Sequence, residues 1–210
     1  GTAERVDRIY DPNIEIDRQG MFETFMISDV NAHFELCPTY PIRLIVPIKL
    51  VLEMDRQTLI NVAQFRSKGR IPLVTYFNKA TGAALFRSSQ PLVATTFAFG
   101  VFRNSSSRDD QALIAHIRCD GRDDAARMFI LDCRPMKNAM ANRFNGGGVE
   151  SAVSYPNCVI DYLNIPNIHV VSAAFAKMQQ AIASRSRRSI SEFYAGIGDW
   201  LDCLQSAHAS

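Results

Sequence analysis

The chain has 210 residues, of which 47% are hydrophobic, so it is long enough to bury one sizeable core. Its 23 basic residues nearly balance its 21 acidic residues, and this small net charge argues against a nucleic-acid-binding protein. Its apolar stretches are shorter than the roughly 18 residues that a transmembrane helix needs.

The cysteines and histidines argue against a structural metal site. The five cysteines are widely spaced and form no Cys-x-x-Cys pair: Cys37, Cys119, Cys133, Cys158 and Cys203. An odd number of separated cysteines favours reduced thiols in a cytosolic protein over a disulfide framework or a zinc site. His33, His116 and His169 occur singly, without the spacing of metal ligands. We therefore expect no metal ion and no cofactor.

The first third of the chain predicts short elements. Residues 1–20 are polar and mixed, and we expect them to add little to the core. Residues 22–30 suit either a strand or a helix. The β-rich run at residues 43–48 predicts a strand that ends near Pro47. Asp55 then stands where an N-cap would begin a helix that continues through about residue 66.

The middle of the chain predicts a hairpin followed by a helix. Apolar runs at residues 71–77 and 83–86 flank five residues that include Gly82, which is typical of a β-hairpin. The last serines of the loop at residues 105–108 would cap a helix over residues 109–118. Two aspartates in its first turn suit the positive end of the helix dipole.

The last third predicts two strands and two helices. Residues 128–131 form an apolar run that is typical of a buried strand, and residues 158–163 predict another strand. Residues 170–183 predict a helix whose core stripe is Val171, Phe175, Met178 and Ile182. Residues 184–191 form a basic linker, either a solvated loop or a contact with an anionic membrane surface. A helix that starts near Trp200 has hardly begun when the sequence ends. Strands alternating with helices favour an α/β fold.

The stretch from Met128 to Glu150 attracts the most attention. A strand ends in a turn that contains Arg134, and a small-residue segment leads to three glycines, Gly146 to Gly148. Glycine backbone can approach another group closely, and an α/β fold often binds an anionic ligand beyond a strand end. The alternative is a loop that only connects two packed elements.

Several short runs, in order along nearly the whole chain, resemble the myotubularin family of 3-phosphoinositide phosphatases. They are CPTYP at residues 37–41, FRSKGRIP at 65–72, GAALFRSSQP at 82–91, DCRP at 132–135, NAMAN at 138–142, GGGVE at 146–150 and NIPNIHV at 164–170. The resemblance implies a mixed β-sheet flanked by helices. Residues 1–210 would be the N-terminal part of a tyrosine-phosphatase-like domain, an incomplete half that ends before the catalytic loop.

Members of the wider phosphatase superfamily use a loop of Cys, five residues and Arg. That spacing occurs at Cys37 to Arg43, but Pro38 and Pro41 lack the N–H groups that would bind phosphate, and a strand follows instead of a helix N-terminus. Cys119 begins a run similar to the family's loop, but Ala125 stands where the arginine should be. We expect neither cysteine to be catalytic, so the chain should be inactive alone.

The resemblance assigns two substrate-binding residues, Asn142 and Asn167. Each would lie near the inositol headgroup, where an amide can both donate to and accept from hydroxyl groups. From the residues alone, Asn142 suits a helix-end cap and Asn167 a turn after Pro166. Arg87 and Arg134 are more typical of structural ion pairs than of ligand contacts.

Two functions stay open on the sequence. The parent protein removes the 3-phosphate from phosphatidylinositol 3-phosphate or the 3,5-bisphosphate, with this chain supplying the pocket wall. Alternatively, it is an inactive scaffold that binds an active partner or a phosphoinositide. Expected partners are the phosphoinositide headgroup and the remaining half of the phosphatase domain, with a membrane surface and homo- or hetero-oligomers as further candidates. The resemblance implies a cytoplasmic protein, peripheral to endosomal membranes, that acts in lipid metabolism and membrane trafficking.

Overall fold

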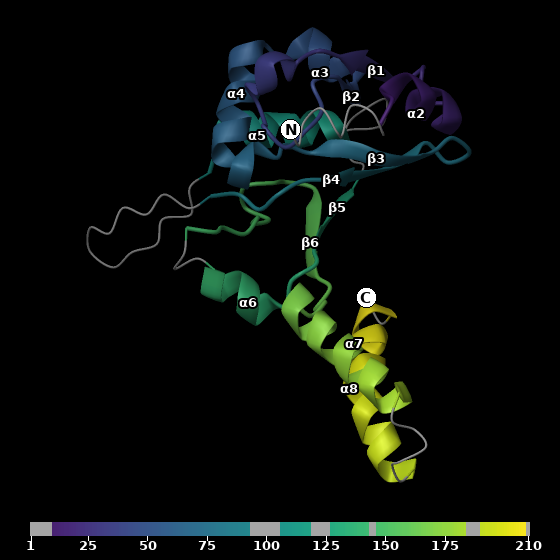
Figure 1. Cartoon of the computed structure of the whole chain (residues 1–210). Helices are drawn as coiled ribbons and strands as arrows, with labels where there is room; N and C mark the ends of the chain where they lie inside the picture. The colour runs from purple at the N-terminus through teal and green to yellow at the C-terminus, as the bar shows by residue number, and fades with distance from the viewer. Residues whose placement is uncertain (1–9, 93–105, 119–126, 143–145, 184–189, 209–210) are drawn as a thin grey trace, which may run out of the picture. The chain divides into compact units, whose positions relative to one another are not determined.

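The computed structural model describes residues 10–92, 106–118, 127–142, 146–183 and 190–208 (Figure 1). The chain divides into two compact units. The first comprises residues 1–128 and 143–158, and the second comprises residues 129–142 and 159–210. Helices and two-stranded sheets occur together among the described residues, which confirms the predicted α/β class.

The first unit combines short helices with two antiparallel strand pairs. Its helices are α2 (Pro12–Gln19), α3 (Ile48–Glu53), α4 (Arg56–Phe65) and α5 (Arg108–Arg118), with 3-10 turns at Ala32–Phe34 and Ser67–Gly69. Its strands are β1 (Phe25–Ser28), β2 (Leu44–Pro47), β3 (Leu73–Asn78) and β4 (Ala83–Arg87). β1 pairs with β2 and β3 with β4, and the second pair is the predicted hairpin.

Helix α2 corrects the expectation that residues 1–20 add little to the core. The Asp11 side chain accepts a hydrogen bond from the Asn13 backbone N–H at 2.8 Å, and Pro12 occupies the first turn. Gly20 ends the helix in the left-handed conformation, with φ of 64°. The helix buries Ile16 beside Phe25 in a small apolar cluster. Its start and stop signals, Asp-Pro and Gly, were present in the sequence.

Helices α4 and α5 contribute most of the larger core of this unit. The Asp55 side chain accepts from the Thr58 backbone N–H at 2.7 Å, which confirms the predicted N-cap. Ser107 caps α5 in the same way, by accepting from the Asp110 N–H. The two helices bury residues that share one apolar cluster with β2 and α3: Leu59, Val62, Ala63, Leu113 and Ile117. Within each helix these residues recur at the spacing of one helix face, as in an amphipathic helix.

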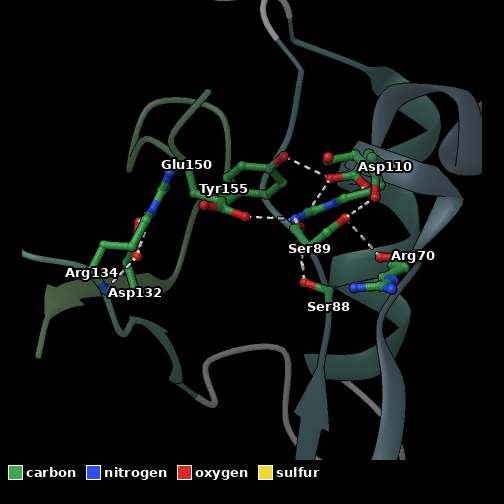
Figure 2. Close-up of polar contacts among 10 residues, drawn as sticks. Arg70, Ser88, Ser89, Asp110, Asp132, Arg134, Glu150 and Tyr155 are labelled. Atoms are coloured by element: carbon green, nitrogen blue, oxygen red, sulfur yellow. Dashed lines mark hydrogen bonds and ion pairs between the residues drawn. The ribbon is translucent and has the colours of Figure 1, made fainter. Parts of the chain in front are cut away.

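A buried arginine, Arg66, connects distant parts of the first unit, and Figure 2 labels three of the residues to which it donates, Ser89, Asp110 and Glu150. Its guanidinium donates to both carboxylate oxygens of Asp110, at 2.8 and 2.6 Å. It also donates to Glu150 Oε1 at 2.6 Å and to the Ser89 carbonyl at 2.9 Å. The Tyr155 hydroxyl donates to Asp110 at 2.7 Å. Four chain segments therefore meet at one cation.

Burial and charge together set the ionisation of this network. Arg66 is 1% exposed and Asp110 0% exposed. Burial alone would lower the pKa of Arg66, but the hydrogen bonds and charge of Asp110 and the charge of Glu150 hold it above its usual value. Burial raises the pKa of Tyr155, and the Asp110 carboxylate raises it further. Arg66 therefore stays charged and Tyr155 stays a hydrogen-bond donor.

Replacing Asp110 by Asn should destabilise the first unit strongly. The change keeps the side-chain shape but removes a buried carboxylate that accepts two hydrogen bonds from Arg66, and it turns an amide NH2 group toward a guanidinium N–H donor. Removing one partner of a buried ion pair costs about 3–5 kcal/mol. Hydrogen exchange of the α4 and α5 amides measures this loss as a lower free energy of opening.

The exposed pair of Arg56 and Glu35 is the matched control. Their side chains are 48% and 46% exposed, so solvent screens their attraction. Glu35→Gln should leave exchange of the same amides unchanged. Equal effects of Asp110→Asn and Glu35→Gln on this exchange would contradict the prediction, because burial would then not increase the contribution of the Arg66 network to stability.

The second unit contains a strand pair and three helices among its described residues. They are β5 (Met128–Asp132), α6 (Met136–Ala141), β6 (Cys158–Tyr162), α7 (Ile168–Ala183) and α8 (Ile190–His208), where β5 and β6 each begin one residue inside the first unit. β5 pairs with β6. Strands at both positions were predicted, whereas a helix at α6 was implied only by the helix-end cap considered for Asn142.

The apolar run at residues 128–131 predicted a buried strand, but one face of strand β5 is exposed. Phe129 is 66% exposed and Leu131 47% exposed, and the alternation of a strand places them on the same face. Val159 of β6 is also exposed. Continuous apolar runs are typical of strands that are covered on both sides. In the second unit one side of this strand is uncovered.

Helices α7 and α8 pack along each other (Figure 1). Phe175 lies against Trp200, with ring centroids 5.3 Å apart, and Lys177 pairs with Asp199 at 2.6 Å. The predicted core stripe of this helix is partly wrong, because α7 buries Ala174 and Ala181, whereas Phe175 and Ile182 are exposed. α8 begins at Ile190, not near Trp200, so the predicted linker is shorter than residues 184–191. Residues 184–189 lie outside the described part.

We expect isolated residues 1–210 to self-associate, because Phe129 and Leu131 present apolar surface to water. Changing both to Ser should reduce the oligomer fraction seen by size-exclusion chromatography with light scattering. Val153→Ser removes another exposed apolar side chain, outside this face, and should leave association unchanged. A monomeric chain with a sharp, reversible thermal transition would contradict this expectation.

Candidate functional site

The second unit contains a pocket where β5 and β6 lead into α6 and α7. Its volume is about 480 Å³, within the size range of small-molecule sites. Two chain segments line it. They are Cys133, Arg134, Pro135, Asn138, Ala141 and Asn142 from the first, and Ile165, Pro166 and Asn167 from the second. Both residues predicted to bind substrate therefore line one pocket, although 25 residues separate them in sequence (167 − 142 = 25).

Backbone hydrogen bonds hold the two segments together. The Leu163 N–H donates to the Asp132 carbonyl at 2.8 Å, and the Ile165 N–H donates to the Cys133 carbonyl at 2.9 Å. These bonds continue the β5–β6 pairing beyond the strand ends. The pocket wall is therefore built on paired backbone, which limits its freedom to deform.

Asn167 is the N-cap of α7. Its side-chain oxygen accepts from the backbone N–H groups of His169 and Val170, at 3.0 and 3.1 Å. Two of the first free N–H groups of the helix are thereby satisfied. The Asn167 amide nitrogen is not used by this cap, so the side chain retains two N–H donors. His169 is exposed in the first turn of α7.

Asn142 lies at the C-terminal end of α6, as the capping interpretation predicted. Its backbone N–H donates to the carbonyl oxygens of Asn138 and Met140. Its side-chain amide makes no hydrogen bond to another residue within the described part of the chain. Its role as a substrate contact stays a prediction.

Arg134 forms the structural ion pair that its sequence context favoured. Its guanidinium approaches the Asp132 carboxylate with a shortest distance of 2.6 Å, and its backbone N–H donates to the same carboxylate at 2.9 Å (Figure 2). Arg87 differs, because it is exposed on β4 and forms no ion pair with any residue that the structure describes.

The glycine run has a structural use in the first unit. The Gly148 N–H donates to the Pro91 carbonyl at 2.7 Å, and Gly147 forms a β-bridge with Leu92. A Cβ atom on Gly148 would lie 2.9 Å from the Pro91 oxygen. The glycines are absent from the pocket lining, so the hypothesis that they bind an anionic ligand beside Arg134 finds no support in these contacts.

The segment around Cys37 is built around an internal side chain. The buried Asn31 oxygen accepts from the backbone N–H groups of Leu36 and Cys37, at 3.1 and 3.0 Å. The Asn31 amide donates to the carbonyls of Cys37 and Pro41. Between Cys37 and Arg43, the Tyr40 N–H donates to the Cys37 carbonyl at 3.3 Å, so this loop N–H is used within the protein and does not point to a phosphate. Cys119 lies outside the described residues.

The described residues contain neither a group of metal ligands nor a membrane-spanning helix. No three His, Cys, Asp or Glu side chains among them gather closely enough to hold a metal ion. None of the helices in the described ranges has both the length and the apolar character to cross a membrane.

Comparison with known proteins identifies the family. The family model described as the myotubularin-like phosphatase domain matches residues 2–208. The chain belongs to the myotubularin family. Three similar proteins are phosphatidylinositol-3,5-bisphosphate 3-phosphatase MTMR2 of Gallus gallus (38% identity over 83% of this chain and 29% of the relative), the same enzyme of Mus musculus (37%, 83% and 26%) and myotubularin of Xenopus tropicalis (33%, 95% and 30%). The chain thus spans less than a third of the length of these relatives.

Several of the short runs that carried the resemblance to myotubularins meet at Arg66. Arg66 lies in FRSKGRIP, Ser89 in GAALFRSSQP and Glu150 in GGGVE. Asp110 and Tyr155 complete the network from segments that carried no motif. Sequence analysis missed the network because the residues of each pair lie between 22 and 84 positions apart. The signal available in the sequence was an arginine, Arg66, that stands between two apolar runs.

Replacing Gly148 by Ala should disrupt the contact with Pro91. The new Cβ would meet a backbone oxygen, which cannot move aside as a flexible side chain could. Overpacking of this kind costs about 1–3 kcal/mol. Hydrogen exchange at the Leu92 amide, which donates to the Phe65 carbonyl at 2.8 Å, should accelerate.

Gly198 of α8 provides the matched control. A Cβ there meets nothing within 4 Å, and alanine favours helix over glycine. Gly198→Ala should leave exchange at Leu92 unchanged and should slow exchange within α8. Unchanged exchange at Leu92 in Gly148→Ala would show that the close backbone approach is dispensable.

Proposed function

We propose that this chain forms the substrate-pocket wall of a cysteine-dependent phosphoinositide 3-phosphatase, with Asn142 and Asn167 holding the inositol headgroup. The observation that carries the proposal is the pocket itself, since two separate family motifs supply its asparagines. The name of the MTMR2 relatives supports phosphatidylinositol 3,5-bisphosphate as substrate, with the 3-monophosphate as the other candidate.

The chemistry of the asparagines suits a sugar-like ring. A neutral amide donates to and accepts from hydroxyl groups, and it does so without competing for the phosphate that must reach the nucleophile. Asn167 would donate, because its oxygen caps α7. Asn142 could do both. Hydrogen bonds of this kind fix the orientation of the ring, and orientation is a large part of catalysis at a positioned nucleophile.

The nucleophile would come from residues beyond this sequence. In the proposed reaction a thiolate attacks the 3-phosphorus, the bond to the inositol oxygen breaks, and a carboxylic acid protonates that oxygen. Water then hydrolyses the phosphocysteine and releases phosphate. Within residues 1–210 only Cys37 has an arginine six positions later, and its surroundings do not suit this task.

The same proposal accounts for the uncovered apolar surface of the second unit. The remaining part of the phosphatase domain would cover Phe129 and Leu131, which are exposed on β5. We further propose that the protein acts in the cytoplasm at endosomal membranes, where its lipid substrate lies, and that oligomer partners add to membrane attachment.

Phosphate release from vesicles containing phosphatidylinositol 3,5-bisphosphate tests the proposal. The full open reading frame should release phosphate, whereas residues 1–210 alone should release none. In the full protein, Asn142→Ala should lower kcat/KM by about 3- to 10-fold, the value of one hydrogen bond between neutral groups. Asn13→Ala, on the exposed surface of α2, should leave kcat/KM unchanged.

The outcomes separate the alternatives. Release by residues 1–210 that disappears in Cys37→Ser would overturn the proposal. A full protein that binds the same vesicles but releases no phosphate would instead establish the scaffold function. Equal kcat/KM values for Asn142→Ala and Asn13→Ala would remove Asn142 from the site.

A further inference from the structure

Asn138 is a third amide in the wall of the pocket. It is the first residue of the NAMAN run, but the resemblance assigned no role to it. It lies four residues before Asn142, so the two side chains leave the same face of α6 one turn apart. The Asn142 N–H donates to the Asn138 carbonyl, which holds the two residues at this spacing. Buried Ala139 fixes the rotation of the helix.

The Asn138 side chain has its full hydrogen-bonding capacity available. Its backbone N–H is used, because it donates to the Pro135 carbonyl at 2.9 Å. Its side-chain amide makes no hydrogen bond to another residue in the described ranges. Asn138 and Asn142 therefore each present an acceptor oxygen and two donor hydrogens, whereas Asn167 presents only donors.

The charge of the pocket is nearly balanced. Arg134 is the one charged residue of its lining, and the Asp132 carboxylate neutralises it through a contact at 2.6 Å. A phosphate group only accepts hydrogen bonds and needs positive charge or several converging donors. A hydroxyl group both donates and accepts. The α6 wall, with two free amide oxygens, therefore matches hydroxyl groups better than phosphate.

From this match we propose that Asn138 and Asn142 together recognise unphosphorylated hydroxyl groups of the inositol ring, and that Asn138 is a specificity-determining residue. The inference rests on the proposed function, because it assumes that this pocket holds the headgroup. It adds the residue Asn138 to the proposed site, and it predicts how the ring is oriented. Asn138 and Asn142 of α6 contact hydroxyl groups of the ring, and other groups hold its phosphates.

Variants of the full open reading frame test the inference. The probe is inositol 1,3-bisphosphate, the soluble headgroup of the 3-monophosphate, whose neighbouring 4-, 5- and 6-hydroxyls are free, and calorimetry measures its Kd. Asn138→Ala removes the amide and should raise Kd by about 2- to 10-fold, as one neutral hydrogen bond predicts. Asn138→Asp keeps an acceptor for a hydroxyl but repels a phosphate, so Kd should stay within about 3-fold of the original value.

Lys137→Ala is the matched control, since Lys137 is an exposed neighbour on α6 that does not line the pocket. It should leave Kd unchanged. Inorganic phosphate serves as a second probe, and Asn138→Ala should leave its affinity unchanged. Alanine and aspartate are both tolerated on an exposed helix face, so loss of folding does not confuse the result.

Each result has one interpretation. A larger loss in Asn138→Asp than in Asn138→Ala would place a phosphate at this wall and overturn the inference. An unchanged Kd in Asn138→Ala, with a raised Kd in Asn142→Ala, would also overturn it while leaving the proposed function intact. No binding of inositol 1,3-bisphosphate by the unaltered protein would overturn both.

Discussion

The first unit depends on the pairing of Arg66 with Asp110. A guanidinium that is 1% exposed cannot stay charged inside a protein without carboxylates, and this one has Asp110 on one side and Glu150 on the other. The hydrogen bonds of the Arg66 guanidinium form only when four segments of the chain lie close together. They are the end of α4, the start of α5, the segment after β4 and the segment after the glycines. Such a pair adds little net stability relative to an apolar contact. Its effect is to exclude arrangements in which any one segment is displaced.

Other polar features of the first unit follow from the same constraint. Ser67 donates to Gln90, and Ser89 donates back to the Ser67 carbonyl at 2.7 Å, so the residues around Arg66 form their own hydrogen-bonded frame. Gly148 packs against Pro91 within this frame, where a side chain would not fit. The glycine run thus has a reason to be glycine that requires no ligand. Polar residues in a family motif can serve the fold as directly as they serve a substrate.

Local signals in the sequence predicted local structure well. Asp55 and the hairpin around Gly82 were recognised because a cap and a turn depend on neighbouring residues. Contacts between distant residues were not predictable in this way. Arg66 and Glu150 are 84 positions apart, and nothing in either neighbourhood indicates the other. The prediction that β5 is buried was wrong for a related reason. An apolar strand indicates that another element packs on it, but the strand's own sequence does not indicate which element that is.

The candidate site shows why capping and binding need not be alternatives for an asparagine. Sequence analysis weighed Asn142 and Asn167 as caps against Asn142 and Asn167 as ligand contacts. Asn167 caps α7 with its oxygen, which leaves its amide nitrogen to donate into the pocket. Asn142 ends α6 through its backbone, which leaves its whole side chain available. Capping also immobilises Asn167, so less conformational entropy would be lost when a ligand binds. A helix end that is already ordered is therefore a favourable place for a recognition group.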